Sequence, residues 1–328
     1  MKKTLKDIAK MVGVSPGTVS KVINNYPDVG ESTRRKVFKV LDQTGYLSHQ
    51  LKTKKKIIGV IYGGRINLNH PFFIEVINSF GEEIGTFGYD LLIFNNDGSN
   101  NYLNRCKEAE IAGCIIMGGD EMQSSIYDID HSDIPCIGID IKLTGDKSGY
   151  LMTDNMIIGK KVIEHFYLLG HRKIGHIGGL QDTITGSERT KGFLNAMSEF
   201  GLNINNDWIM HGDFTEQSGY QVMQELLSKN KVIPSAIFVA SDNMAYGVIN
   251  AIKEFGLKVP DDIAIIGCDD IEISRYINQP LTTIRQDKRR IGKLAAHMLN
   301  DLNNNVTHSS SVMIEAKLII RKSCGAEI

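Results

Sequence analysis

The chain has 328 residues, 42% of them hydrophobic and 23% charged, the composition of an ordinary globular protein with room for two or three domains. It contains no run of 18 apolar residues and begins with charged residues instead of a signal-peptide core, so we expect no membrane span and a cytoplasmic location. Residues 1–57 hold 13 basic and 4 acidic side chains, a formal charge of +9 in a chain of net charge −1. This division predicts an N-terminal segment that binds a polyanion and an acidic remainder that does not.

Two short helices joined by a tight turn are predicted in residues 4–24. Thr4 and Asp7 have the spacing of a capping box, apolar residues follow at helical intervals, and Gly13 ends the helix. Ser15 is the expected N-cap of the second helix and Pro16 its first residue. Such a pair indicates a helix-turn-helix whose second helix enters the DNA major groove. The alternative is a small helical hairpin at one end of an enzyme.

A third helix and a basic linker follow. The helix is expected to begin after Gly30, its N-cap, and to end at Gly45. Its basic side chains either lie on a solvated face or contact backbone phosphates. Residues 46–57 show no apolar periodicity and contain the run Lys54, Lys55 and Lys56, which predicts a linker lying near DNA.

From Ile57 onwards, apolar runs alternate with helical patterns, which predicts doubly wound parallel-sheet α/β architecture in two similar lobes. Strands are expected at 57–64, 89–97, 112–119, 134–140, 173–179, 208–214, 236–242, 263–270 and within 312–323. Helices are expected at 71–87, 101–111, 121–130, 155–169, 187–200, 216–228, 243–256 and 287–302. Ligands of such sheets bind beyond the carboxyl ends of the strands, in a cleft between the lobes. The candidates at those ends are Asp140, Phe214, Ser241, Asp242, Asp269 and Asp270.

The chain resembles the lactose-repressor (LacI/GalR) family over nearly its whole length. The stretches LKDIAKMVGVSPGTVSKVINN and VGESTRRKVFKVLDQTGY carry the resemblance in the head. HPFF (70–73), SERTKGF (187–193), SDNMAYG (241–247) and VPDDIAIIGCDD (259–270) carry it in the body. The resemblance implies a head at 1–46, a shortened basic hinge at 47–57, and a periplasmic-binding-protein-like body at 58–328. It further implies an N-subdomain at about 58–153 and 287–315 and a C-subdomain at about 154–286 and 316–328, joined by three crossings.

The resemblance also implies which residues contact DNA. Thr18 and Lys21 are expected to lead recognition, whereas Pro16 and Gly17 offer no side-chain hydrogen bond and limit direct readout. One helix-turn-helix reads one half-site, so we expect a homodimer on a palindromic operator in double-stranded DNA. The full set of expected DNA contacts is Thr4, Leu5, Ser15, Pro16, Gly17, Thr18, Ser20, Lys21, Asn24, Thr33, Lys54, Lys55 and Lys56.

The hinge departs from the family pattern. Neither the Pro-Asn start nor the Ala-Arg-x-Leu helix of other members follows Gly45 and Tyr46, and Leu51 is the one remaining candidate to wedge into the minor groove. A helix of one or two turns is marginal in water. We therefore expect a largely extended linker that follows phosphates and bends DNA little.

For the effector site, the resemblance implies contacts from Arg189 and Asp269, a sugar contact from Asp140 and an aromatic platform at Phe214. Each has an alternative: a lobe-interface ion pair for Arg189, a turn for Asp140, core packing for Phe214, a cap of the next helix for Asp269 and its neighbour Asp270, and a helix cap for Ser241 or Asp242. Of Phe72 and Phe73, one is expected to pack inward. The full set of expected effector contacts is Phe72, Phe73, Asp140, Arg189, Phe214, Ser241, Asp242, Asp269 and Lys288.

Two basic residues bear on the charge of the effector. Lys288 stands where many family members have an apolar or aromatic residue, and Arg65 follows the first strand of the body. If both face the cleft, an anionic effector such as a sugar phosphate becomes plausible, although surface solvation is the expected state of both.

The sequence contains no constellation that indicates catalysis. Neither G-x-S-x-G nor a P-loop occurs, no G-x-G-x-x-G follows a strand, and the histidines and five cysteines show no metal spacing. We therefore expect no enzyme activity, no metal and no cofactor. The leading hypothesis is a DNA-binding transcriptional regulator that responds to a sugar, and a repressor is the expected kind of regulator. A solute-binding receptor, an enzyme fused to a DNA-binding head, and effectors such as a purine, a sugar phosphate or a protein co-repressor are the alternatives.

Overall fold

The structure is a computed structural model, and it describes residues 4–23, 26, 29–44, 56–63, 70–95, 101–118 and 124–327. The chain divides into two compact units, Met1–Lys56 and Ile57–Ile328, which we call the head and the body. In the part of the chain that the structure describes, no helix combines the length and the apolar character needed to cross a membrane.

The head contains α1 (Leu5–Val12), α2 (Pro16–Ile23) and α3 (Glu31–Gln43). The predicted capping box is present, since the backbone N–H of Asp7 donates to Oγ1 of Thr4 and that of Thr4 donates to the Asp7 carboxylate. Gly13 ends α1 in the left-handed conformation, with φ of 77°. The side chain of Ser15 accepts from the backbone of Thr18 at 3.0 Å, which confirms it as a cap of α2.

The apolar faces of the three helices meet in one small core. Each of α1, α2 and α3 contributes two buried residues to it, which confirms the apolar helix faces predicted from periodicity. These residues are Ile8, Ala9, Val19, Val22, Val37 and Leu41. The head is thus a helix-turn-helix braced by a third helix.

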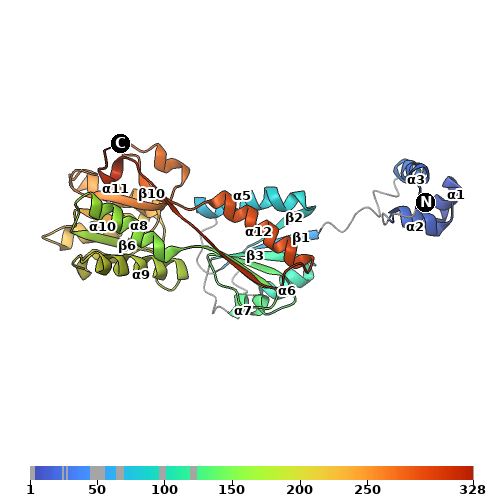
Figure 1. Cartoon of the computed structure of the whole chain (residues 1–328), viewed down its shortest axis with the longest axis horizontal. Helices are drawn as coiled ribbons and strands as arrows, with labels where there is room; N and C mark the ends of the chain where they lie inside the picture. Colours follow the sequence, from blue (N-terminus) through green and yellow to red (C-terminus); the bar gives the residue numbers. More distant parts are fainter. Residues whose placement is uncertain are drawn as a thin grey trace. The chain divides into compact units, whose positions relative to one another are not determined.

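The body consists of two lobes, each built on one sheet (Figure 1). The first sheet has the order β11 (Ser310–Ile314), β5 (Ser148–Thr153), β4 (Cys136–Ile139), β3 (Gly113–Met117), β1 (Lys56–Tyr62), β2 (Tyr89–Phe94). The second sheet has the order β12 (Lys317–Ile319), β10 (Thr282–Arg285), β9 (Ala264–Asp269), β8 (Ala236–Val239), β6 (Ile174–Gly178), β7 (Ile209–His211). The pairs with a defined register are parallel, except for the antiparallel pair of β10 and β12.

Helices cover both sheets, as expected for doubly wound lobes. The first lobe has α5 (Pro71–Thr86), α6 (Tyr102–Glu108), α7 (Ser124–Asp130) and α12 (Lys288–Asn303), and α5 packs along α12 (Figure 1). The second lobe has α8 (Asn155–Leu168), α9 (Ile184–Glu199), α10 (Glu216–Lys229) and α11 (Asp242–Glu254). The chain passes between the lobes after β5, after β10 and between β11 and β12.

Several elements differ from the sequence prediction. The strands β5 and β10 were not predicted, and in β5 the run SGYLMT mixes polar and apolar residues although nearly all of it is buried. The helix α9 begins at Ile184, three residues before the predicted start, because Thr183 caps it by accepting from Gly186 at 3.1 Å. The predicted strand 208–214 shortens to β7 at the sheet edge.

Some predictions fall on residues outside those described. They include the whole linker at 47–55 with Leu51, Lys54 and Lys55, as well as Asn24, Gly45 and Arg65. Lys56 is described, lies exposed and begins β1.

Candidate functional site

A cavity of about 410 Å³ lies between the two lobes of the body. Its wall is formed by the carboxyl ends of strands and the first turns of helices, where the parallel-sheet rule places a ligand. The first lobe contributes His70, Phe72, Phe73, Gly118 and Asp140. The second lobe and the crossing after β10 contribute Leu180, Thr183, Thr185, Arg189, Asp213, Phe214, Thr215, Glu216, Asn243, Asp269 and Gln286.

Three residues of this wall have a backbone conformation that side chains rarely adopt. Asp140, Phe214 and Asp269 have φ of 56°, 69° and 121°, and each stands at or just beyond the end of a strand. Such strain persists only where the surrounding structure holds it, and it concentrates at functional sites. These three residues were among the candidates from the sequence, and the structure brings all three to the same cavity.

Arg189 is buried in the cavity wall, and two of its three nitrogens already engage the protein. Its Nε donates to Oδ1 of Asn155 at 2.9 Å, and its Nη1 donates to the carbonyl oxygen of Ala240 at 2.5 Å. Nη1 also lies 3.9 Å from the carboxylate of Asp269. The guanidinium is therefore fixed by the second lobe, and Nη2 is the nitrogen whose donors no described protein group engages.

Asp140 has a buried carboxylate that receives no hydrogen bond from the described residues. It follows β4, and only 8% of its surface is exposed. Burial raises its pKa to about 6, the charge of Arg189 lowers it, and the charges of Asp269 and Glu188 raise it further. A buried carboxylate in this state is stabilised by hydrogen-bond donors, which a ligand or water in the cavity can supply.

Asp269 is held by Gln286, a cavity residue that the sequence did not suggest. The amide nitrogen of Gln286 donates to Oδ1 of Asp269 at 2.7 Å, and Oε1 of Gln286 has no partner among the described groups. This bond joins the end of β9 to the crossing after β10. It fixes the direction of the Asp269 carboxylate.

Aromatic side chains supply the apolar part of the wall. Phe72 is buried in the core of the first lobe and Phe73 is partly exposed, as predicted for this pair, and their rings meet edge to face at 5.2 Å. His70 packs edge to face on Phe73 at 5.8 Å, and burial lowers its pKa. The ring of Phe214 lies against Gly179, where an added Cβ would stand 2.0 Å from Cζ of the ring.

Three predicted effector contacts do not reach the cavity wall. Two of them are Ser241, the N-cap of α11, which accepts from Met244 at 3.2 Å, and Asp242, which is enclosed in the second lobe. Asp242 accepts from Ser274 at 2.7 Å, Thr283 at 2.6 Å and the backbone of Ile271 at 3.0 Å. Hydrogen-bond donors of the protein already engage both side chains. The prediction that Ser241 and Asp242 contact a ligand is therefore corrected: both have structural roles.

Lys288 is the third predicted effector contact outside the cavity wall, and two predictions about it are wrong. It is neither solvated nor part of the cavity wall: its Nζ is buried and donates to the carbonyl oxygens of Asp269 at 2.8 Å and Asp270 at 2.9 Å. The same Nζ lies 3.3 Å from the carboxylate of Glu75 on α5. Asp270, in turn, does not cap a helix but pairs with Arg285 and Arg321.

Sequence reasoning missed several polar residues of the wall. Thr183 caps α9, Thr185 lies in its first turn and Asn243 lies in the first turn of α11, so all three occupy helix starts. Gln286 and His70 precede helices as well. The usable signal was the position of each residue between a strand and the next helix, which applies to hydroxyl, amide and imidazole side chains as much as to acids and aromatics.

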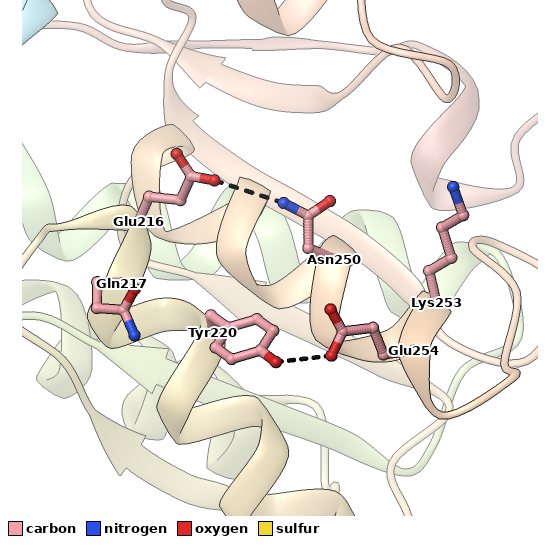
Figure 2. A pocket seen from close by; sticks show the side chains of 6 residues that line it. All are labelled: Glu216, Gln217, Tyr220, Asn250, Lys253 and Glu254. Carbon is pink, nitrogen blue, oxygen red and sulfur yellow. Dashed lines mark hydrogen bonds between the residues drawn. The ribbon is translucent and has the colours of Figure 1, made fainter.

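A second hollow of about 740 Å³ lies on the outer face of α10 and α11 (Figure 2). Its side chains are largely exposed and engage one another: Tyr220 donates to Glu254 at 2.6 Å and Asn250 donates to Glu216 at 3.4 Å (Figure 2). Glu216 also lines the cavity between the lobes. No predicted effector residue lies here, so the cavity between the lobes is the candidate effector site.

In the head, the predicted DNA contacts are spread over the outer faces of the helices. On α2, Pro16, Gly17 and Lys21 are exposed, and Thr18 and Ser20 are half-buried. Ser15 is exposed and its Oγ lies 2.8 Å from Oγ1 of Thr18, so the two hydroxyls form one polar patch at the start of α2.

The remaining head residues of the DNA-contact set lie at the starts of α1 and α3. Thr4 is exposed, and Leu5 and Thr33 are half-buried. On α3, Arg34 donates to the carbonyl oxygens of Val29 and Tyr26, and Arg35 pairs with Glu31. Of the four basic residues of this helix, Lys36 and Lys39 therefore suit phosphates better than the arginines do.

Comparison with known proteins identifies the family. Residues 4–48 match "Bacterial regulatory proteins, lacI family", and residues 163–324 match "Periplasmic binding protein-like domain". The HTH-type transcriptional repressor PurR of Photobacterium profundum is 35% identical over 98% of both chains. That of Pasteurella multocida is also 35% identical over 98% of both chains.

Solved structures share the fold. The cellobiose complex of the transcriptional regulator CelR is 25% identical, with a TM-score of 0.73, over 98% of this chain and 99% of that one. The lac repressor dimer bound to operator and the anti-inducer ONPF is 23% identical, with a TM-score of 0.81, over 99% of this chain and 100% of that one. The helix-turn-helix head, the two-lobed body and the identity to the curated repressors agree, and the chain belongs to the lacI family of bacterial regulatory proteins as a DNA-binding transcriptional regulator.

Proposed function

We propose that the protein is a repressor that binds a palindromic operator as a homodimer and whose operator affinity is set by a neutral sugar bound between the lobes of the body. The observation that carries the effector part is the wall of the cavity. It combines the carboxylates of Asp140 and Asp269, the remaining donors of Arg189, and the rings of Phe73 and Phe214. Carboxylates, amides and a guanidinium bind hydroxyl groups, and a ring face binds the C–H face of a sugar.

The helix-turn-helix supports the DNA part of the proposal. One recognition helix spans one half-site, and a two-fold dimer supplies the second. In the recognition helix, Thr18 and Lys21 offer side-chain hydrogen bonds to bases or phosphates. Lys36 and Lys39 add exposed positive charge on α3.

A purine base is the second candidate effector. A planar ring fits against Phe73 and Phe214, and Asp269 and Gln286 together offer both acceptors and donors to the edge of a base. The name PurR of the two repressors that are 35% identical to this chain favours this candidate. The density of hydroxyl-binding groups around the rest of the wall favours a sugar.

A titration of operator DNA tests the proposal. Fluorescently labelled palindromes from the promoter region of the protein's own gene are bound by the full chain, with and without monosaccharides, disaccharides and purine bases. We expect binding with dimer stoichiometry and a change in operator affinity with one class of compound. Stable binding of monomers, or operator affinity that no sugar or purine changes, would contradict the proposal.

A further inference from the structure

Lys288 places one buried ammonium group between the two lobes of the body. It is the first residue of α12 in the first lobe, and only 5% of its side chain is exposed. Its Nζ donates to the carbonyl oxygens of Asp269 and Asp270, which belong to the second lobe, and lies 3.3 Å from the carboxylate of Glu75 on α5 in the first lobe. The three N–H groups of the ammonium thus have partners in both lobes.

The two residues that Lys288 contacts in the second lobe form a turn of unusual backbone conformation. Asp269 and Asp270 have φ of 121° and 50° in succession, a conformation that persists only where the surrounding structure holds it. Arg285 and Arg321 hold the carboxylate of Asp270 from within the second lobe. Lys288 holds the carbonyl oxygens of both residues from the first lobe. The turn is therefore fixed from both lobes at once.

This turn belongs to the effector cavity, because Asp269 lines the cavity wall. Gln286 directs the carboxylate of Asp269 by donating to its Oδ1 at 2.7 Å. The carbonyl oxygen of the same residue accepts from Lys288 at 2.8 Å. A ligand that binds the carboxylate of Asp269 would therefore act on a residue whose backbone is bonded to the first lobe.

On the other side of Lys288, α5 and α12 are joined closely enough to move together. The Oγ of Ser79 on α5 donates to the carbonyl oxygen of Arg289 at 2.7 Å. A Cβ added at Gly292, one turn beyond Lys288, would stand 2.4 Å from the carbonyl oxygen of Val76. The two helix backbones thus approach each other as closely as a glycine allows. A displacement of Lys288 would act on this pair of helices and not on α12 alone.

We propose that Lys288 is the positioning residue that couples the effector cavity to the first lobe. It acts through the backbone of Asp269 and not on the ligand. When an effector engages the carboxylate of Asp269, Lys288 passes the change to α5 and α12. Coupling of this kind requires an element whose arrangement both sites bias, and the buried ammonium bonded to both lobes is such an element. The inference rests on the function proposed above, in which the occupied cavity sets operator affinity.

The test separates the binding of an effector from the response to it. Full-length wild type and Lys288→Met are titrated with glucose, ribose, cellobiose, adenine, guanine and hypoxanthine. Calorimetry gives the affinity for each compound, and operator titrations give the factor by which the compound changes operator affinity. Lys288→Met should bind the active compound within about threefold of the wild type, whereas the factor should fall at least about fivefold, toward one.

Two further variants separate this coupling from general loss of stability. Glu75→Ala removes the link from the ammonium to α5 on a side chain that is 48% exposed, so the chain should fold and the factor should still fall. Lys293→Met removes a cation of the same helix, 3.3 Å from Glu83 on α5, a pair that lies within the first lobe. It should keep the wild-type factor.

A measurement without effector tests the tie between the lobes directly. Spin labels are attached at Asp128→Cys on α7 and Ser228→Cys on α10, both exposed positions, while the five native cysteines are buried. Lys288→Met should broaden the distribution of distances between the labels, because the bonds from Lys288 to the second lobe are lost. Lys293→Met should leave the distribution unchanged.

A wild-type factor in both Lys288→Met and Glu75→Ala, or an equal loss in Lys293→Met, would overturn the inference and leave the proposed function in place. Loss of compound binding together with the response would show that Lys288 supports binding alone, and it would also overturn the inference. A panel that leaves the wild type unaffected would contradict the proposed function. The label distances would then decide the inference, and an unchanged distribution in Lys288→Met would overturn it.

Discussion

The ammonium of Lys288 lies 2.8 Å from the carbonyl oxygen of Asp269, so the first residue of α12 holds the backbone of a cavity residue. Asp269 has φ of 121°, a conformation that an L-residue keeps only when neighbouring groups fix it. Lys288 also pairs with Glu75 on α5, which belongs to the first lobe like α12 itself, whereas Asp269 belongs to the second lobe. One buried cation thus joins the effector cavity to the helices of the first lobe.

The first prediction concerns this cation. Lys288→Met keeps the apolar stem of the side chain but removes three interactions and leaves two buried carbonyl groups with fewer donors. We expect the free energy of unfolding of the body to fall by about 2–3 kcal/mol, since unpaired buried polar groups carry a desolvation cost. Urea unfolding followed by circular dichroism measures the change.

Lys293→Met is the matched control for this substitution. Lys293 stands on the same helix and lies 3.3 Å from Glu83 of α5, the separation of Lys288 from Glu75, but its side chain is 50% exposed against 5% for Lys288. An exposed pair contributes little because water screens it. Equal losses in the free energy of unfolding for the two substitutions would show that the burial of Lys288 adds nothing to stability.

The second prediction concerns pH. The pKa of Asp140 is about 6 in the folded chain against an ordinary value of 3.8, so the folded state binds the proton more tightly than the unfolded state. Asp140 therefore favours folding most below pH 4, and this contribution is lost as pH rises through about 6. The loss amounts to about 2 kcal/mol between pH 4 and pH 7. Chemical unfolding of the wild type and Asp140→Asn across this range measures it as a difference.

The difference between the two proteins isolates Asp140 from other groups. Burial raises the pKa of Asp242 to about 7, but Asp242 is present in both proteins. The charged groups facing Asp140, namely Arg189, Glu188 and Asp269, are also shared. Parallel pH profiles for wild type and Asp140→Asn would show that Asp140 is already paired or solvated in the folded chain.

The sequence predicted the head well because its signals are local. Thr4, Gly13 and Ser15 are caps whose partners lie within five residues, and the apolar spacing of each helix needs no distant information. The strand β5 was missed because its burial comes from neighbours in the sheet, β4 on one side and β11 on the other. The pairing with β11, which lies far along the chain, leaves no mark in a window of six residues.

For the cavity, the sequence predicted which residues stand at the ends of strands better than it predicted what their side chains contact. The ends of parallel strands gave Asp140, Phe214 and Asp269 correctly, since the sheet rule alone places them at one edge. The same rule wrongly included Asp242, whose three hydrogen-bond donors come from residues 29 to 41 positions away. Which acid faces a ligand and which faces the protein depends on such contacts, and these emerge only in the folded chain.

The third prediction concerns Phe214. Gly179→Ala would place a Cβ within 2.0–2.6 Å of three ring atoms of Phe214, so the ring must move. We expect the free energy of unfolding to fall by about 1–3 kcal/mol, as for other overpacked sites. In Phe214→Ala the ring is absent, so adding Gly179→Ala to it should cost much less. A double-mutant cycle in urea measures this coupling.

Gly85→Ala is the control, because a Cβ at that position of α5 meets no atom within 4 Å. It should leave stability unchanged or raise it, since alanine favours a helix over glycine. Additive costs of Gly179→Ala and Phe214→Ala would mean that the ring does not rest on Gly179.

The fourth prediction concerns operator recognition. Lys21→Ala should weaken operator binding by about 1–3 kcal/mol and relax the preference for one base pair if the lysine contacts a guanine. Lys39→Ala, on the third helix, should weaken binding to all sequences alike, because a phosphate contact carries no sequence information. Titration of operators with single base-pair changes separates the two. Unchanged affinity and unchanged preference in Lys21→Ala would reject its role.

The fifth prediction concerns the linker. Replacing Lys54, Lys55 and Lys56 by Gln should lower the slope of log affinity against log salt by up to about three, since each phosphate contact adds about one. Leu51→Ala should change operator affinity little, because a linker this short, without the Ala-Arg-x-Leu pattern, is expected to remain extended and not to wedge into the minor groove. Salt titrations and a gel assay of DNA bending measure both. A sharp operator kink that disappears in Leu51→Ala would show that the short linker still acts as a lever.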